Sequence, residues 1–186
     1  METLSGLWMP ILLSAVLVFI ASSVIWNVLG AHKWHTKVLP DEPGVLEALG
    51  KQGLAPGQYS FPYVADPKAM KEPAFQEKLK KGPVGLLVVR APGPINMGTF
   101  LGQWFVYLLF VSTLVAMVCG QALHTGDQYM LVFRVAGAVA FAAYSMGTIP
   151  NAIWWGRPWK SALKELVDGI VYGLLTAGTF GWLWPR

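Results

Sequence analysis

The stretch SALKELVDGIVYGLLTAGTFGWLWP, residues 161–185, decides the fold that we predict for this chain. Gly169, Gly173, Ala177 and Gly181 recur in it every four residues, so a helix places their small side chains in one row. Such a row lets another helix approach closely, and close van der Waals contact is one of the main attractions between helices in lipid. We therefore predict a membrane helix on which other helices of the chain pack.

The composition is that of a membrane protein. Of 186 residues, 54% are hydrophobic and 13% are charged, whereas an average soluble domain has about 25% charged residues. The single cysteine, Cys119, excludes an intramolecular disulfide and a cysteine-based zinc cluster. The net charge of +4 comes from basic residues that flank apolar segments. Membrane topology and anionic lipid explain these residues better than nucleic acid does, so no nucleic-acid partner is expected.

Four apolar segments are long enough to cross a hydrocarbon layer of about 30 Å, which takes roughly 20 helical residues. The predicted fold class is an all-α membrane protein with four transmembrane helices and a small α+β cytoplasmic insertion between helices one and two. The expected division is 1–30 for the first helix, 31–96 for the cytoplasmic subdomain and 97–186 for the last three helices. The predicted spans are residues 6–29, 97–123, 130–155 and 161–183.

The insertion contains its own local signals. Asp41 can cap a helix that starts at Glu42 or Pro43, and a second helix is predicted over 73–81, opened by proline and closed by Gly82. Residues 58–64 and 84–89 are aromatic or β-branched runs that predict two short strands. These strands are expected to form a small antiparallel pair.

The distribution of Lys and Arg predicts the orientation. Residues 31–96 hold nine of them, residues 157–164 hold three, and the turn at 124–129 holds none. Because basic connections stay in the cytoplasm, both termini are expected outside. The expected location is the bacterial inner (cytoplasmic) membrane, crossed several times.

Small residues also recur on the third predicted helix. Ala136, Ala140, Ala143 and Gly147 lie on one helical face. We expect this face to pack tightly against the small-residue row of the fourth helix.

Two histidines follow the first span. His32 and His35 are three residues apart, a spacing that could place both imidazoles on one metal ion if the helix continues. Two ligands are too few for a protein metal site, so a solvated pair at the membrane interface is the favoured interpretation.

Polar residues inside the predicted spans carry more information, because charged groups in lipid are turned toward partners or water. Lys164 and Asp168 are four residues apart and predict an ion pair near the cytoplasmic interface. The alternative is a proton or cation site, which Asn151 and Tyr172 could join. Near the outer face, Arg134 is expected to pair with Asp127; a site for a substrate carboxylate is the less favoured alternative.

Three segments carry a resemblance to a family. They are AHKWHTKVLPDEPGVLEALGKQGLAPGQYSFPY (31–63), KKGPVGLLVV (80–89) and LLTAGTFGWLWPR (174–186). The chain resembles uncharacterised small bacterial four-helix integral membrane proteins with an LPDE stretch after the first helix. The resemblance implies the same topology, but it implies no activity and no residue roles.

No nucleophile and base, no facing histidines within the spans and no cofactor motif occur in the sequence. A non-enzymatic membrane protein without cofactors is therefore expected. Its partners would be membrane lipids and other membrane-protein subunits or further copies of itself, and its role that of an accessory or scaffold subunit of a larger inner-membrane complex, for example respiratory or photosynthetic. The alternative is a small transporter or channel that uses Asp168.

Overall fold

The computed structural model describes residues 4–28 and 37–186. The chain forms two compact units, a helical unit (Met1–His35 and Asn96–Arg186) and a loop unit (Thr36–Ile95). Each is described separately. The predicted histidine pair, His32 and His35, lies outside the described residues.

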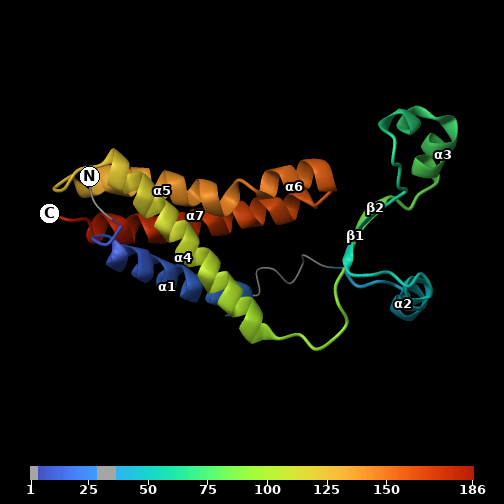
Figure 1. The fold of residues 1–186 in the computed structure, drawn as a ribbon, viewed down its shortest axis with the longest axis horizontal. Helices are drawn as coiled ribbons and strands as arrows, with labels where there is room; N and C mark the ends of the chain where they lie inside the picture. Colours follow the sequence, from blue (N-terminus) through green and yellow to red (C-terminus); the bar gives the residue numbers. More distant parts are fainter. Residues whose placement is uncertain (1–3, 29–36) are drawn as a thin grey trace. The chain divides into compact units, whose positions relative to one another are not determined.

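The helical unit is built from long apolar helices (Figure 1). Pro10 lies in the first turn of α1 (Trp8–Ser23), where a backbone N–H would have no partner within the helix. The Asn96 side chain accepts a hydrogen bond from the Thr99 N–H (3.2 Å) and caps α4 (Met97–Ala122). The helices are α1 (Trp8–Ser23), continued by a π-helical turn (Val24–Val28), α4 (Met97–Ala122), α5 (Tyr129–Ser145), α6 (Thr148–Trp155) and α7 (Trp159–Trp182).

One continuous helix is predicted over 130–155. This prediction is wrong in one respect, because the structure has two helices there, α5 and α6, with a break between them. Pro150 lies in the first turn of α6. A proline has no N–H to donate to the carbonyl four residues earlier, here that of Met146, and its ring collides with that carbonyl. The chain therefore ends α5 at Ser145 and restarts at Thr148.

Three segments of the described chain are long and apolar enough to cross a membrane: Trp8–Asn27, Met97–Ala122 and Tyr129–Trp155. They correspond to the first three predicted spans. Helix α7 has 24 residues but is not among the three. Glu165, Asp168 and several glycines and threonines reduce its hydropathy, so the fourth span stays a prediction.

Helix α7 nevertheless has the central place in the helical unit. It lies along α5 over most of their lengths and also packs on α1, while α4 crosses both α1 and α5 (Figure 1). Fully buried side chains of α1, α4, α5 and α7 form the interior, among them Val18, Leu108, Val132 and Phe180. Burial of this kind makes the helices one packed unit.

The small residues of α7 approach α5 very closely. A Cβ atom added to Gly169 would overlap Ser145 (2.9 Å from its Cβ), and one added to Gly181 would lie 2.7 Å from the Tyr129 ring. At Gly173 the nearest atoms are backbone and Cβ atoms of Phe141, at 3.4 Å. Side chains at these positions of α7 would push the two helices apart.

The α5 side of this contact differs from the predicted row. The Cβ of Ala177 faces Gly137, and the other neighbours of the row are Tyr129, Phe141 and Ser145. Ala136 and Ala140 are instead buried in the core cluster that includes Val115 and Phe180. Gly147 differs most from the prediction. It is exposed, and a Cβ added to it would meet nothing within 4 Å. The reason is that α5 ends at Ser145, before this position.

The C-terminal segment is hydrogen-bonded to the connection between α4 and α5. The Trp184 indole N–H donates to the His124 carbonyl (2.9 Å), and the Gly126 N–H donates to the Pro185 carbonyl (3.0 Å). These bonds attach the chain end to the connection between α4 and α5. Positive φ at Gly126 (+84°) allows that connection to turn.

The loop unit has the four local elements that the sequence predicts, namely α2 (Glu42–Lys51), β1 (Gly57–Phe61), α3 (Pro73–Lys81) and β2 (Gly85–Val89). A 3₁₀ turn (Pro67–Lys71), which was not predicted, precedes α3. The Asp41 carboxylate accepts the Gly44 N–H (3.0 Å) and caps α2. Strands β1 and β2 pair antiparallel, with Tyr59 opposite Leu87. The predicted helix over 73–81 and the antiparallel pair are confirmed.

Replacing Gly169 by alanine tests the α5–α7 contact. An alanine in a helix interior is normally favoured over glycine by about 1 kcal/mol. Here we expect Gly169→Ala to destabilise the protein by about 1–3 kcal/mol, because its Cβ overlaps Ser145. Thermal unfolding in detergent measures the effect.

Gly178→Ala is the matched control, because the nearest atom to an added Cβ there is 3.8 Å away. This variant should be as stable as the parent or slightly more so. Equal stability of the two alanine variants would show that the close approach does not hold α5 and α7 together.

Candidate functional site

Four aromatic side chains of the helical unit contact one another in turn, so that their ring contacts form a closed circuit. Trp104 and Tyr107 come from α4, Tyr144 from α5 and Tyr172 from α7. The ring centroids are 5.3 Å apart for Trp104 and Tyr107, 6.2 Å for Tyr107 and Tyr144, 5.6 Å for Tyr144 and Tyr172, and 6.4 Å for Tyr172 and Trp104. Most of these contacts are edge-to-face, the arrangement that ring quadrupoles favour. The circuit fixes the positions of three phenolic hydroxyls between three helices.

Buried hydroxyls without hydrogen-bond partners lie around this circuit. Within the described chain they are Tyr144 Oη, Ser145 Oγ, Thr148 Oγ1 and Tyr172 Oη. Ser145 is completely buried, and Tyr172 is only 5% exposed. Buried polar groups are normally satisfied, and an unsatisfied one costs about 1–3 kcal/mol. The Tyr144 and Tyr172 rings are in contact, and Ser145 directly follows Tyr144 at the end of α5. We call the four hydroxyls the hydroxyl cluster.

Other buried hydroxyls of the unit do have partners. Ser14 of α1 and Ser112 of α4 are hydrogen-bonded to each other (3.0 Å), and Ser14 also donates to the Pro10 carbonyl (2.7 Å). Thr176 donates to the Tyr172 carbonyl (2.9 Å). Unsatisfied hydroxyls are therefore the exception in the described part of the interior.

Asp168 lies beside the hydroxyl cluster on α7. It is only 9% exposed, and it precedes Tyr172 by four residues, so both side chains leave the same helical face. It also neighbours Gly169, whose backbone touches Ser145. The structure thus brings together two residues of the predicted polar site, Asp168 and Tyr172, and adds the α5 hydroxyls of Tyr144 and Ser145, which the prediction did not include.

The other two residues of the predicted polar site are placed differently. Lys164 is partly buried one turn before Asp168, but the predicted ion pair between them does not form. Asn151 is exposed on α6, and its side-chain amide donates to the Gly147 carbonyl (3.1 Å). Asn151 is therefore outside the hydroxyl cluster.

An ion pair that the sequence did not predict joins Arg157 to Glu165. The guanidinium donates to both carboxylate oxygens, with 2.8 Å from Nη1 to Oε2 and a second bond from Nη2 to Oε1. The Glu165 side chain is only 16% exposed. Gly156, in a left-handed conformation (φ +65°), turns the chain so that Arg157 can reach α7. This bidentate pair fixes the connection between α6 and α7.

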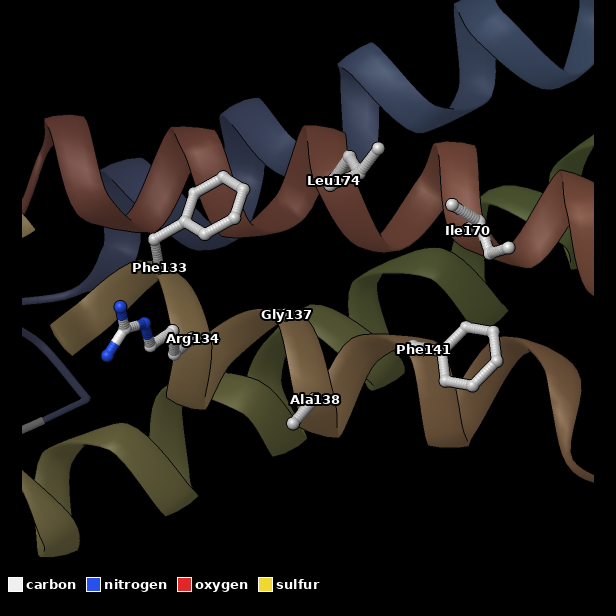
Figure 2. A pocket seen from close by; sticks show the side chains of 7 residues that line it. All are labelled: Phe133, Arg134, Gly137, Ala138, Phe141, Ile170 and Leu174. Carbon is white, nitrogen blue, oxygen red and sulfur yellow. The ribbon is translucent and has the colours of Figure 1, made fainter. Parts of the chain in front are cut away.

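The predicted pair of Arg134 and Asp127 also does not form. The Asp127 carboxylate accepts the His124 N–H (2.7 Å) and stabilises the turn between α4 and α5. Arg134 lies instead at an open groove between α5 and α7, with a volume of about 320 Å³ (Figure 2). The groove is lined by Phe133, Arg134, Gly137, Ala138, Phe141, Ile170 and Leu174.

A second pocket, of about 300 Å³, lies between the end of α1 and the start of α4. Trp104 borders it and donates its indole N–H to Ser22 (2.9 Å). Its lining residues are Ser22, Ser23, Trp26, Asn27, Met97, Phe100, Leu101 and Trp104. It holds no acid, base or thiol, so its chemistry is that of an apolar site with a few hydrogen-bonding groups.

A metal centre finds no support in the described part of the chain. No group of three or more His, Cys, Asp or Glu side chains is placed there to hold a metal ion.

Sequence reasoning found Asp168 and Tyr172 because they are polar residues in an apolar segment. It considered Thr148 only as a hydrogen-bonding residue between helices, and it missed Tyr144 and Ser145, which are adjacent polar residues near the end of an apolar segment. Comparisons with protein-family models, with curated proteins and with solved structures give no match for this chain.

Proposed function

We propose that the chain is a four-span integral membrane protein that acts as a non-enzymatic accessory or scaffold subunit. Its partner would be another membrane-protein subunit or a second copy of the chain. Two features support this role, the length and packing of α7 and the exposed surface of the loop unit.

The length and contacts of α7 favour a fourth span. Its 24 residues extend about 36 Å, more than the hydrocarbon thickness of about 30 Å. It packs on α5 and α1, which both belong to apolar segments long enough to span. Its acidic residues are turned away from lipid, because Glu165 is paired with Arg157 and Asp168 is buried.

The positions of basic residues favour one orientation in a bacterial inner membrane. The loop unit and the connection from α6 to α7 carry most of the Lys and Arg residues, and the connection from α4 to α5 carries none. In a four-span path the first two lie on the same side, which the charge bias makes the cytoplasm. Both termini would then be outside.

Reporter fusions test this topology. A fusion at Lys51 should report the cytoplasm, and a fusion after Arg186 should report the external compartment. A cytoplasmic signal after Arg186 would mean that α7 does not span, and an external signal at Lys51 would reverse the whole orientation.

The single observation that carries the subunit role is that the loop unit has no core. No residue from 37 to 95 is buried. Apolar side chains in it are open to solvent, with Leu46 of α2 60% exposed and Val88 of β2 63% exposed. The helical unit, in contrast, buries side chains from each of its long helices.

A unit of this kind benefits from a partner. A two-stranded sheet is only marginally stable in water by itself, so burial of exposed apolar side chains against a partner would stabilise it. A protein partner that covers Leu46 and Val88 would supply the burial that the loop unit lacks. This is the physical reason for preferring a subunit over a solitary protein.

Replacing both exposed residues tests the subunit role. Leu46→Gln keeps a good helix former and Val88→Thr keeps a β-branched residue, so the local elements should persist. We expect the parent, purified from its native membrane in mild detergent, to migrate as an assembly larger than the monomer. The double variant should migrate as the monomer while inserting normally.

Lys51→Gln, another exposed change in α2, is the control and should leave the assembly intact. Mass measurement of the parent assembly distinguishes a second copy from a different subunit. A monomeric parent, or an unchanged assembly of the double variant, would remove the subunit proposal.

A second candidate function is proton or cation passage through the helical unit. The observation that favours it is the hydroxyl cluster next to Asp168, because ionisable groups inside spans commonly mark ion paths. Water bound by these hydroxyls would provide a proton path. Four helices alone leave little room for one, so we rank this function second.

Asp168→Asn separates the two candidates. If the chain is a subunit, the variant should keep its assembly, and liposomes that contain the parent should show the same proton and cation flux as liposomes that contain the variant. Asp127→Asn is the matched control, because it also removes a carboxylate but lies in the turn between α4 and α5. Flux in the parent that persists in Asp127→Asn and disappears in a folded Asp168→Asn protein would favour passage over the subunit role.

A further inference from the structure

The groove between α5 and α7 combines an apolar floor with one cation. Apart from Arg134, every side chain that lines it is apolar, and Gly137 contributes none. Ile170 and Leu174 of α7 are 47% and 53% exposed along its edge. In Figure 2 Phe133 and Arg134 lie at one end and Phe141 at the other. A ligand that fits this surface has an apolar part and a negatively charged end.

The dimensions agree with one leaflet of a membrane. From Phe133 to Phe141 the groove follows nine residues of α5, a rise of about 12 Å. Half of a hydrocarbon layer of about 30 Å is about 15 Å. A ligand lying in the groove would therefore stay within the leaflet next to the connection between α4 and α5.

Arg134 is placed to meet a headgroup. It lies five residues after the start of α5, about 8 Å along the helix, and its long side chain can reach the interface. It is exposed and forms no ion pair with any described residue, while Asp127, its predicted partner, is bonded to the His124 N–H. A guanidinium binds phosphate oxygens in a bidentate geometry.

We propose that this groove is a binding site for an anionic phospholipid, with an acyl chain between α5 and α7 and the phosphate at Arg134. Charge complementarity selects the headgroup, and the apolar lining selects the chain. The inference rests on the proposed membrane placement of α5 and α7, but it does not require a protein partner.

Native mass spectrometry of the purified full chain tests the site, with phosphatidylglycerol as the anionic lipid and phosphatidylcholine as the zwitterionic one. The parent should bind phosphatidylglycerol about tenfold more tightly than phosphatidylcholine, the range expected for one charge-assisted contact. Arg134→Gln should lose this preference, and Arg134→Lys should keep part of it. Lys160→Gln, which removes an exposed cation outside the groove, should behave as the parent.

Ala138→Leu tests the apolar part independently of charge. Ala138 is exposed and lines the groove, so a larger side chain should fill it and weaken binding of both lipids without disturbing the core. Detergent-thermal stability without added lipid should match the parent for both Ala138→Leu and Arg134→Gln. If Arg134→Gln does not fold, Arg134→Lys and Ala138→Leu still decide the question.

Three results would overturn the lipid site. Arg134→Gln could retain the preference for phosphatidylglycerol. Inorganic phosphate could compete with the lipid in the parent while Ala138→Leu binds normally, which would indicate a free-anion site. The parent could form a lipid-independent dimer that Ala138→Leu abolishes, which would indicate that a second copy fills the groove. Because binding is measured on the isolated chain, loss of a protein partner cannot imitate any of these results.

Discussion

The close approach of α5 and α7 is the constraint on which the helical unit depends. Glycine at positions 169, 173 and 181 removes the side chains that would separate the helices, and contact with Ser145, Phe141 and Tyr129 follows. This matters because α7 is less apolar than the other long helices of the unit. Contact with lipid stabilises a helix with acidic residues only weakly, whereas protein neighbours that cover its polar face stabilise it more. Packing on α5 and α1 gives α7 those neighbours.

The same contact creates two different surfaces. On the interior side, Gly169 brings α7 against Ser145, and the hydroxyl cluster lies next to Asp168. On the outer side, Gly137 leaves a shallow apolar groove whose cation is Arg134. The first is buried and carries hydroxyls, and the second is apolar and open. A ligand for the second would be amphiphilic.

The two units of the chain differ in what holds them together. The helical unit has buried side chains, an interhelical serine pair and an attached C-terminal segment. The loop unit depends on local devices, namely the Asp41 cap, the proline start of α3 and one strand pair. Local devices define elements but bury little apolar surface, and burial is the main source of stability. The loop unit is therefore the part of the chain that a partner would stabilise most.

The sequence by itself determined the elements, because their causes are local. Apolar length predicted the helices over 97–122 and 159–182 nearly to their ends, and the signals at Asp41, Pro73 and Gly82 predicted α2 and α3. Only the tertiary structure decided which faces meet. Helical spacing shows that Ala136 and Ala140 share a face, but the rotation of α5 against α7 placed Gly137 and Ser145 in the contact. Ion pairs followed the same rule. Arg157 reaches Glu165, while Lys164 does not pair with Asp168, because the path of the chain through Gly156 brings the guanidinium over α7. Spacing within one helix limits the possible partners, and the packing of separate segments selects among them.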